Sequence, residues 1–480
     1  MILNEGNLRP IAIDLFAGAG GLSLGFEQAG FDVAAAVEID PIHCAIHKFN
    51  FPDTAVIPKS VVGLSASEIR EAAGIGNRQV DCVFGGPPCQ GFSMIGQRVL
   101  DDPRNSLVLE FVRIVAELGA RTFVFENVKG LTVGRHKAFL EELIAAFGAK
   151  GYDVSPAKVL DASNYGVPQK RQRLILLGSK KGTQLPTHPL ASTNAADTKK
   201  PIPNLPFGPT CSDALGDLPD AERFFGLLDS DNVKATGFGK PSPYAAELRC
   251  QTNDAWHFGY VRDWKSGVLT SSARTDHTEI SRGRFAKTPP GAVEPVSRFF
   301  KLAPNGLSNT LRAGTDAARG AFTSPRPIHY AYNRCVTVRE MARLHGFPDW
   351  FRLHATKWHG ARQIGNSVPP PLARAIGFSI MEALNIAPIR PKGTIKLGDP
   401  NLLYMEMSQA AAHFSVAKPS SKRDRKSGAR KRKQHEIEGA RVSMEIVEAP
   451  PSCRSLKSGA QKRKQVNIER ERLTRKASYA

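Results

Sequence analysis

Short apolar runs alternate with helix-like segments through the first 180 residues of the chain. Each run is rich in Val, Ile, Leu, Ala or Phe, and a turn or an amphipathic stretch follows it. Strands that alternate with helices in this way are typical of a parallel sheet covered by helices, so the pattern predicts an α/β fold. The predicted strands are residues 11–16, 33–37, 54–57, 80–84, 121–125 and 174–178, with a helix at 106–118.

The pattern changes after residue 180. Residues 181–209 are rich in Pro, Thr, Asn and Lys, which is typical of a loop or linker. From 210 to 335 the sequence is irregular, with many Gly, Pro and Arg residues, and it predicts a smaller, loop-rich domain. Helical periodicity returns at 337–344 and 371–384. Beyond residue 388 the composition predicts disorder.

Composition sets limits on this protein. The chain has 480 residues and 41% hydrophobic content, enough for two or three domains with a proper core. No apolar run approaches the ~18 residues of a membrane helix and no signal-peptide pattern is present, so we expect a soluble, cytoplasmic protein without a membrane partner. The seven cysteines lack C-x-x-C spacing, which argues against a structural zinc site or a disulfide framework, and we expect no metal.

The net charge of +20 indicates a polyanionic partner. The excess is concentrated at the C-terminus, where residues 418–480 hold 19 Lys and Arg against 7 Asp and Glu, a net of +12. Within this stretch the sequence KSGARKRKQ at 426–434 recurs as KSGAQKRKQ at 457–465. A repeated basic motif is usual in a solvated tail and also occurs in phosphate-binding arms, and charge alone leaves both open.

The segment Gly85-Gly-Pro-Pro-Cys-Gln-Gly-Phe-Ser93 follows a predicted strand and holds one cysteine, Cys89. In open α/β sheets the loops after the strands form the ligand site. The two prolines restrict the backbone before the thiol, which suits a nucleophile that must stay in one place. A structural cysteine in a Pro-Gly turn is the alternative.

A glycine-rich loop, Phe16-x-Gly18-x-Gly20-Gly21, lies between the first strand and a helix, and Glu38 ends the second strand. Glycines let the backbone approach a ligand closely, and a helix N-terminus offers free N–H groups. An acidic side chain about 20 residues later can accept hydrogen bonds from both hydroxyl groups of a ribose. The combination predicts a nucleoside-containing cofactor, but it does not separate a dinucleotide from S-adenosylmethionine.

Three further polar segments stand at element boundaries. Glu126 ends the fifth strand, where a carboxyl group in a dry crevice can keep and donate a proton. Gln169, Arg171 and Arg173 alternate before the next strand, and guanidinium groups on one face suit phosphate or carbonyl oxygens. Residues 362–371 join an amide and a hydroxyl to a proline run at a helix start. Taken singly, each segment also fits a structural role, as a salt-bridged Glu, a basic edge strand or an ordinary helix start.

Together these segments resemble the motifs of the DNA cytosine-5 methyltransferase family, in order and in spacing, over residues 9–180 and 335–380. The similar motifs are Asp14–Gly21 (cofactor loop), Gly86–Gln90 (nucleophile loop), Glu126–Val128 (acid), Gln169-x-Arg171-x-Arg173 (arginines), Arg339–Pro348 (support of the recognition domain) and Gln363–Pro369 (closing motif). The resemblance implies a Rossmann-like S-adenosylmethionine-dependent methyltransferase domain at 1–185, completed by 359–388. It also implies a target recognition domain at 186–358, and the composition adds a disordered basic tail at 389–480.

The resemblance gives each motif residue a role. Cys89 would add to C6 of cytosine, Glu126 would protonate N3, and Arg173 would bind O2 with Arg171 in support. S-adenosylmethionine would supply the methyl group, and the target base would be flipped out of double-stranded DNA. The implied cofactor residues are Phe16, Gly18, Gly20, Glu38, Leu107, Asn366 and Val368, and the implied DNA contacts are Gln90, Ser93, Arg98 and Gln169. Candidates for guanine or phosphate contacts in the recognition domain are Arg262, Arg274, Arg282, Arg284, Arg312 and Arg319.

We therefore expect a bacterial DNA (cytosine-5-)-methyltransferase of restriction–modification type. It would act as a monomer in the cytoplasm and on the nucleoid, with a restriction endonuclease as functional partner. A tRNA cytosine-5 methyltransferase would keep the chemistry and change the substrate. A non-catalytic DNA-binding relative would require the loss of a key group, yet Cys89, Glu126 and Arg173 are all present. A nicotinamide oxidoreductase would explain the glycine loop alone.

Overall fold

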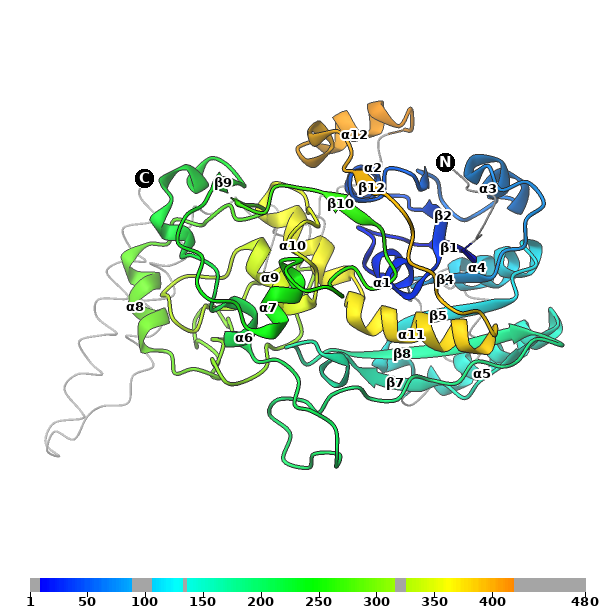
Figure 1. Ribbon diagram of the computed structural model, residues 1–480, viewed down its shortest axis with the longest axis horizontal. Helices are drawn as coiled ribbons and strands as arrows, with labels where there is room; N and C mark the ends of the chain where they lie inside the picture. The colour runs from blue at the N-terminus through cyan, green and yellow to red at the C-terminus, as the bar shows by residue number, and fades with distance from the viewer. Residues whose placement is uncertain (1–8, 89–105, 133–135, 316–324, 418–480) are drawn as a thin grey trace, which may run out of the picture. The chain divides into compact units, whose positions relative to one another are not determined.

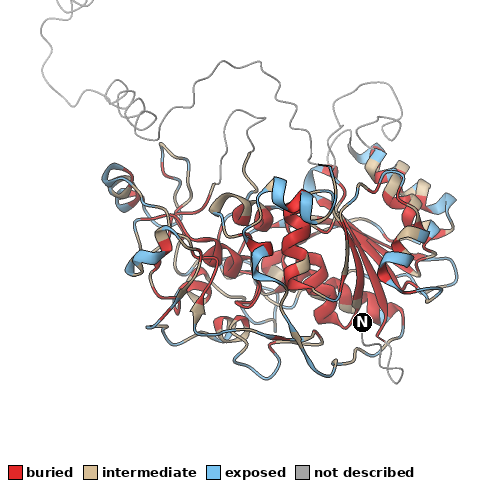
Figure 2. Ribbon diagram, turned by 90° about the horizontal axis from the view of Figure 1, so that it is seen from above, coloured by how far each residue is buried: buried red, intermediate tan, exposed pale blue. Residues whose placement is uncertain are grey.

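The computed structural model describes residues 9–88, 106–132, 136–315 and 325–417 (Figure 1). All of these residues belong to one compact unit, Met1–Asp424, and none of them belongs to the second unit, Arg425–Ala480. Buried residues gather along the central strands and the helices beside them (Figure 2). In the described part of the chain, no helix combines the length and the apolar character that a membrane crossing requires.

One eight-stranded sheet organises the first half of the chain. Its order is β3-β2-β1-β4-β5-β8-β6, with β7 also paired to β8. Strands β1 to β5 are parallel, whereas β8 runs antiparallel to β5, β6 and β7. The strands are β1 (Ile11–Leu15), β2 (Asp32–Val37), β3 (Ala55–Ile57), β4 (Cys82–Gly85), β5 (Thr122–Val128), β6 (Tyr152–Val154), β7 (Lys158–Asp161) and β8 (Gln172–Lys180). The predicted α/β fold with a mostly parallel sheet is confirmed, although the apolar pattern does not predict β6 or β7.

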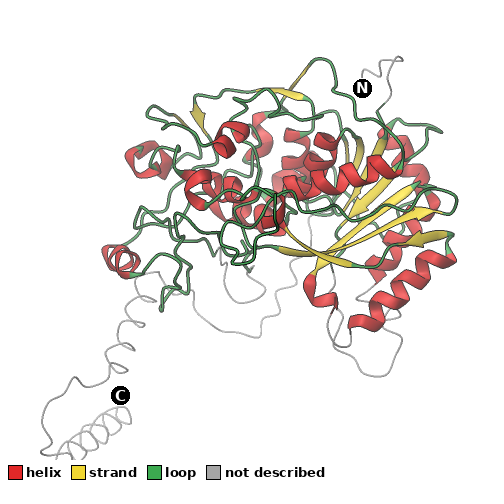
Figure 3. Cartoon of the chain, turned by 60° about the horizontal axis from the view of Figure 1, so that its bottom comes forward, coloured by secondary structure: helices red, strands yellow, loops and turns green. Residues whose placement is uncertain are grey.

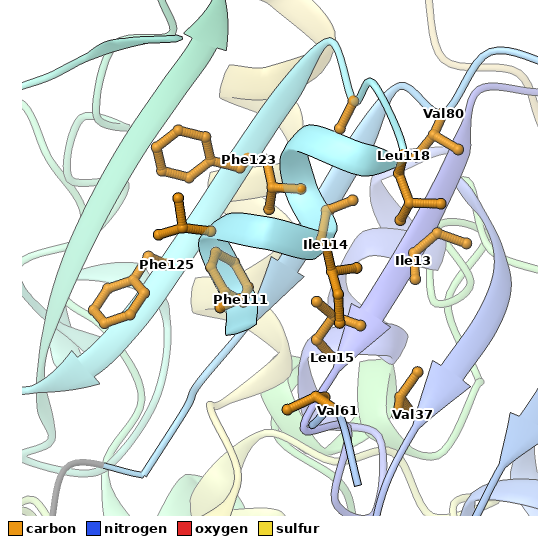
Figure 4. Close-up of a cluster of buried hydrophobic side chains, with 14 of the residues drawn as sticks. Ile13, Leu15, Val37, Val61, Val80, Phe111, Ile114, Leu118, Phe123 and Phe125 are labelled. Carbon is orange, nitrogen blue, oxygen red and sulfur yellow. The ribbon is translucent and has the colours of Figure 1, made fainter. Parts of the chain in front are cut away.

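Side chains of the central strands alternate between the two faces of the sheet. Ile13 of β1 and Phe123 of β5 pack with helices α3, α4 and α5 on one face. Their neighbours Ala12 and Val124 pack with α1 and α11 on the other. Figure 4 shows Ile13 and Phe123 with the α4 side chains Phe111 and Ile114. Because a strand points successive side chains to opposite faces, burial on both sides explains the continuous apolar runs. The helices are α1 (Gly21–Ala29), α3 (Ala66–Ala73), α4 (Ser106–Glu117), α5 (His136–Ala149) and α11 (Pro370–Ala383).

Helix α11 returns from late in the sequence and packs directly on α1. A Cβ on Gly25 would lie 2.3 Å from Cβ of Ala373, and a Cβ on Gly377 would lie 2.6 Å from Cβ of Ala29. The two helices can approach this closely only because glycine stands at both positions. The contact brings the segment before α11, which holds the closing motif, next to the first glycine loop.

Residues 186–358 carry short elements joined by long loops (Figure 3). Their core is continuous with helix α2 (Pro41–Asn50), since Ile46 of α2 belongs to the same buried cluster as Met341 and Phe347. The predicted division into a catalytic and a recognition domain therefore stays a prediction. The elements are α6 (Cys211–Leu215), η5 (Ala221–Arg223), η6 (Phe225–Leu228), β9 (Val233–Lys234), α7 (Pro243–Leu248), β10 (Val261–Asp263), β11 (Val268–Leu269), α8 (Glu279–Lys287) and α9 (Val338–His345).

Residues 389–417 correct the predicted boundary of the tail. They form β12 (Thr394–Lys396), which pairs in parallel with β10, then η8 (Pro400–Leu403) and α12 (Met407–His413). Leu402 and Leu403 are buried in the cluster that contains α2. The prediction of disorder is wrong here because these residues bury apolar side chains against an existing core, while the basic residues after them dominate the composition. Residues 418–480 lie outside the described part of the chain.

Candidate active site

A cavity of about 600 Å³ lies at the carboxyl end of the parallel strands. Its walls are the segments after β1, β2 and β4, the end of β5, the start of β8, and the end of helix α10 (Lys357–Asn366) with the residues after it. Open α/β sheets bind ligands at this edge because the loops after the strands converge there. Of the predicted site residues, the cavity brings together Phe16, Gly18, Glu38, Glu126, Arg173, Asn366 and Val368.

Glu126 and Arg173 form an ion pair in this cavity. Arg173 Nε lies 2.7 Å from Glu126 Oε1, and the side chains are 13% and 12% exposed. The antiparallel register of β5 and β8, in which Val128 is opposite Arg173, places both residues at the same edge of the sheet. Burial raises the pKa of Glu126 above the usual glutamate value, and the charges of Arg173 and Arg171 oppose that rise. A carboxyl group in this setting can hold a proton and donate it.

The loop after β4 is held against this ion pair. A Cβ on Gly86 would lie 2.5 Å from Glu126 Oε2, so glycine leaves the space that the carboxylate occupies. Asn127 Nδ2 donates a hydrogen bond to Pro87 O at 2.9 Å and ties the loop to the end of β5. Pro87 and Pro88 line the cavity, and Cys89 follows them in the sequence. The predicted residues Cys89, Gln90, Ser93 and Arg98 lie outside the described residues.

Glu38 joins the glycine loop to the end of β2. Its Oε2 accepts a hydrogen bond from Gly18 N at 2.8 Å, and its Oε1 accepts one from Asp40 N at 2.9 Å. Asp40 also caps helix α2 and lines the cavity. Phe16 has a φ of 64°, in the left-handed region that residues other than glycine seldom adopt. Such a conformation is common where a backbone is shaped around a ligand.

Two buried polar atoms in the cavity wall have no partner among the described residues. Gln363 is 1% exposed, and its Oε1 accepts a hydrogen bond from His354 N at 2.9 Å. Its amide nitrogen is therefore turned away from His354, and it finds no acceptor within the described protein. His43 Nε2 is likewise buried without a partner in the described residues. Because buried polar groups are nearly always hydrogen-bonded, both positions indicate a place for a polar ligand or water.

Arg171 does not line the cavity, but it bonds to residues that do. Its side chain is fully buried, and Nη1 donates to Leu311 O at 2.9 Å. Nη2 donates to Gly365 O at 2.8 Å and to Ser367 O at 2.7 Å. Arg171 precedes β8, which begins at Gln172, so the alternation of a strand does not apply to it. Arg171 thus fixes the closing motif to the start of β8.

Gln169 corrects a prediction, because its side chain is fully buried. Its Nε2 donates to Leu344 O at 3.2 Å and also bonds His345 Nδ1, while its Oε1 accepts from Leu311 N at 3.1 Å. The predicted contact of Gln169 with DNA is therefore wrong for this structure, because the whole amide is engaged inside the protein.

Two predicted cofactor residues stand apart from the described residues that line the cavity. Gly20 caps α1 with a φ of 100°, and a Cβ there would lie 2.5 Å from the ring of Phe51. The left-handed backbone and the close packing both require glycine at this position. Leu107, in the first turn of α4, is half-buried and packs against the core beside the sheet.

Several cavity residues received no role from the sequence, among them Arg362, Gln363, Asp40 and His43. Gln363 begins the closing motif and Arg362 directly precedes it, so the motif could have suggested them. Asp40 precedes a proline at a helix start, which is a recognisable capping signal. His43 carries no signal in the sequence, because its place in the wall depends on how α2 packs.

Comparisons with known proteins agree with this geometry. Residues 11–382 match the family described as C-5 cytosine-specific DNA methylase. The chain is 59% identical over 410 residues to the Type II methyltransferase M.XorII of Xanthomonas oryzae pv. oryzae, a match that covers 85% of this chain and 93% of the relative. It is 33% identical over 376 residues to the Type II methyltransferase M1.HphI of Haemophilus parahaemolyticus, covering 77% and 86%. A crystal structure described as a DNA modification methyltransferase of an E. coli prophage is similar with a TM-score of 0.62 and 34% identity, over 78% of this chain and 99% of that one.

Proposed function

The chain belongs to the C-5 cytosine-specific DNA methylase family, and we propose that its cavity methylates C5 of a flipped cytosine with Cys89 as the nucleophile. The protein is a DNA (cytosine-5-)-methyltransferase of the Type II, restriction–modification kind. The observation that most supports the proposed site is the Glu126–Arg173 ion pair. It stands in the same cavity as Pro87 and Pro88, the residues that precede Cys89 in the sequence.

Each residue at the base-binding end has a defined task. The thiolate of Cys89 bonds to C6 of cytosine, and the displaced electron pair moves toward N3, which takes a proton from Glu126. Arg173 donates hydrogen bonds to O2 and holds Glu126 in orientation. The ring thereby becomes an enamine whose C5 is electron-rich enough to accept a methyl group. Once the methyl group has left the cofactor sulfur, loss of the C5 proton to solvent restores the C5–C6 double bond and releases the thiolate of Cys89, and N3 returns its proton to Glu126.

The other end of the cavity fits the cofactor. S-adenosylmethionine, on which methyltransferases of this family depend, supplies the electrophilic methyl group when bound. Glu38 would accept hydrogen bonds from the ribose hydroxyls, Phe16 and Gly18 would approach it through the backbone, and Asn366 and Val368 would close over it. The buried nitrogens of His43 and Gln363, which lack partners among the described residues, support a polar ligand of this kind.

Replacement of the proposed nucleophile tests the mechanism. Cys89→Ser should abolish methyl transfer, measured as tritium incorporation from labelled S-adenosylmethionine, while duplex DNA still binds. Cys453→Ser is the matched control and should keep full activity. Activity of Cys89→Ser close to that of the unmodified protein would refute the assignment.

A mechanism-based trap gives a second test. A duplex that contains 5-fluorocytosine should form a covalent adduct at Cys89, because fluorine cannot leave C5 as a cation and the sulfur stays attached. Mass spectrometry of the digested protein would locate the adduct. The absence of any adduct at Cys89 would argue against the proposed nucleophile.

The remaining assignments extend this proposal. We propose that the protein acts as a monomer on double-stranded DNA, in the bacterial cytoplasm, beside a restriction endonuclease of the same specificity. Residues 186–358 would form the target recognition domain. Similarity to Type II methyltransferases favours DNA over a tRNA substrate and favours an active enzyme over a non-catalytic relative. Comparing tritium incorporation into DNA and into tRNA would decide the substrate.

A further inference from the structure

A second cavity, of about 280 Å³, opens among residues 293–312 and 325–327. Its described lining residues include three arginines, an asparagine and two phenylalanines, and none of them is acidic. A hollow with several cations and no acid is suited to an electron-rich partner such as nucleic acid. The six residues are Arg298, Phe299, Phe300, Asn309, Arg312 and Arg326.

Three of these side chains present polar groups that the described protein does not use. Arg298, Asn309 and Arg312 are exposed, and none of their side chains has a hydrogen bond or an ion pair with a described residue. Arg326, in contrast, is 8% exposed and is fixed in place. Its Nη1 donates to Val336 O at 3.1 Å and its Nη2 to Thr275 Oγ1 at 2.7 Å. The cavity therefore combines a rigid arginine with three side chains that can bond to a ligand.

Other arginines of the predicted recognition region are already occupied by acids of the protein itself. Arg262 pairs with Glu27 at 2.7 Å, Arg282 with Glu222 at 2.7 Å, and Arg284 with Glu294 at 3.5 Å. These three candidates are therefore engaged in ion pairs within the protein. Arg319 lies outside the described residues, whereas the guanidinium of Arg312 has no acidic partner within them.

The cavity is tied to the active site through a short backbone path. Ser308 N donates to Pro168 O, and Lys170 N donates to Ser308 O, each at 2.9 Å. Arg171 Nη1 holds Leu311 O, the residue before Arg312. Arg171 stands two positions before Arg173 of the active site, so the loop 308–312 keeps a fixed place relative to the base-binding groups.

We infer that Arg298 and Arg312 determine sequence specificity by reading guanine edges beside the target cytosine, with Asn309 as an adenine reader in the same cavity. Arginine makes two parallel hydrogen bonds to O6 and N7 of guanine, and asparagine does the same to N6 and N7 of adenine. Phosphate contacts would need only charge, whereas this cavity also offers an amide and two aromatic rings. The inference rests on the proposed function, because a flipped cytosine must sit at Glu126 and Arg173.

Conversion sequencing of methylated DNA tests this inference directly. Purified enzyme is incubated with unmethylated genomic DNA, and the methylation rate is read at every cytosine and sorted by flanking sequence. Arg312→Ala and Arg298→Ala should each relax discrimination against the wrong base at one position near the target by roughly 5- to 150-fold. Where a variant no longer discriminates in favour of guanine at a position, 7-deazaguanine is placed at that position of the substrate. This base should slow the unmodified enzyme and leave the rate of that variant unaffected.

Arg78→Ala is the control, since Arg78 lies before β4, at the edge of the sheet opposite the active site. It should leave the sequence profile unchanged. If Arg298→Ala and Arg312→Ala instead slow every sequence equally and lower the salt dependence of binding by about one unit, they contact phosphate and the inference fails. Unaltered profiles in both variants would overturn it as well. An unmodified enzyme that methylates no cytosine would overturn the proposed function along with it, so the two failures are distinguishable.

Discussion

Arg173 holds Glu126 from the adjacent antiparallel strand, with Arg173 Nε 2.7 Å from Glu126 Oε1. Two effects act on the carboxyl group in opposite directions. Burial favours its neutral form and is the larger effect, while the positive charge of Arg173 favours the ionised form. The ion pair thus holds the carboxyl group of Glu126 in a fixed orientation, while burial lets that group keep a proton.

Glu126→Gln should lower the single-turnover rate of methyl transfer by about 10²- to 10⁴-fold, because glutamine cannot protonate N3. DNA affinity should change little, since the amide keeps the shape of the carboxyl group. In the unmodified enzyme the rate should fall as pH rises through the raised pKa of Glu126. Glu141→Gln, on the exposed face of α5, is the control and should retain full activity. A Glu126→Gln rate within threefold of the control would contradict the role of Glu126.

Gly86→Ala should reduce activity and leave stability almost unchanged. The new Cβ would lie 2.5 Å from Glu126 Oε2, so the carboxylate must move from its place beside Arg173. The displaced atom is the free end of a side chain, so the cost to the free energy of unfolding is small. The displacement nevertheless moves the proton donor out of its place. We expect about 100-fold slower methyl transfer, since small misplacements have effects of this size.

Gly130→Ala is the matched control for that substitution, because a Cβ at Gly130 meets no atom within 4 Å. Thermal unfolding and single-turnover rates would be measured for both variants. Equal rates for the two would show that Gly86 does not shape the position of Glu126.

Arg171→Met and Arg173→Met should separate stability from catalysis. Loss of the Arg171 guanidinium leaves three buried carbonyl oxygens without a donor, so the free energy of unfolding should fall by about 2–4 kcal/mol. Arg173 is partly exposed and has one acid partner, so its loss should affect the rate far more than the unfolding midpoint in urea. The opposite pattern would reverse the roles assigned to these two arginines.

Much of the sheet and the chemistry could be predicted from the sequence, for a physical reason. Strands β1, β2, β4 and β5 are buried on both faces, so they appear as uninterrupted apolar runs. Glu126 and Arg173 stand at the ends of strands, where motif and topology indicate the same edge. By contrast, β6 and β7 are short strands of three and four residues, and the single buried position in each is too few to form a pattern.

The failures of prediction share a different cause. Gln169 has the residue type of a DNA contact, yet its amide bonds to the backbone of two distant segments, at Leu344 O and Leu311 N. Local sequence cannot show those partners. Residues 389–417 fail for the same reason, because the surface that buries Leu403 is formed by α2, over 350 residues earlier in the chain.

Deletion of residues 418–480 should lower the salt dependence of DNA binding while catalysis on saturating DNA persists. The deleted segment carries a net charge of +12 and two copies of a basic motif, and each Lys or Arg that neutralises a phosphate adds about one to the salt slope. The cut must stay after residue 417, because β12, η8 and α12 belong to the folded unit. Deletion from 389 serves as the contrasting variant and should also lower the unfolding temperature. An unchanged salt slope after the shorter deletion would exclude a DNA-binding role for this segment.

The free energy of unfolding should decrease as pH rises because of Asp14, whose carboxyl group is fully buried in β1. Burial raises the pKa of Asp14 to about 8, although Ser23 Oγ donates a hydrogen bond to Asp14 Oδ2 at 2.6 Å. The folded protein therefore holds a proton that the unfolded chain releases above about pH 4. This contribution to the free energy of unfolding is complete below about pH 4 and is lost as pH rises toward 8.

Urea unfolding at several pH values would measure this decline in stability. The decline should be flatter in Asp14→Asn than in the unmodified protein, and it should be unchanged in the control Asp153→Asn, at an exposed position. Parallel declines in all three proteins would mean that Asp14 is ionised in the folded state.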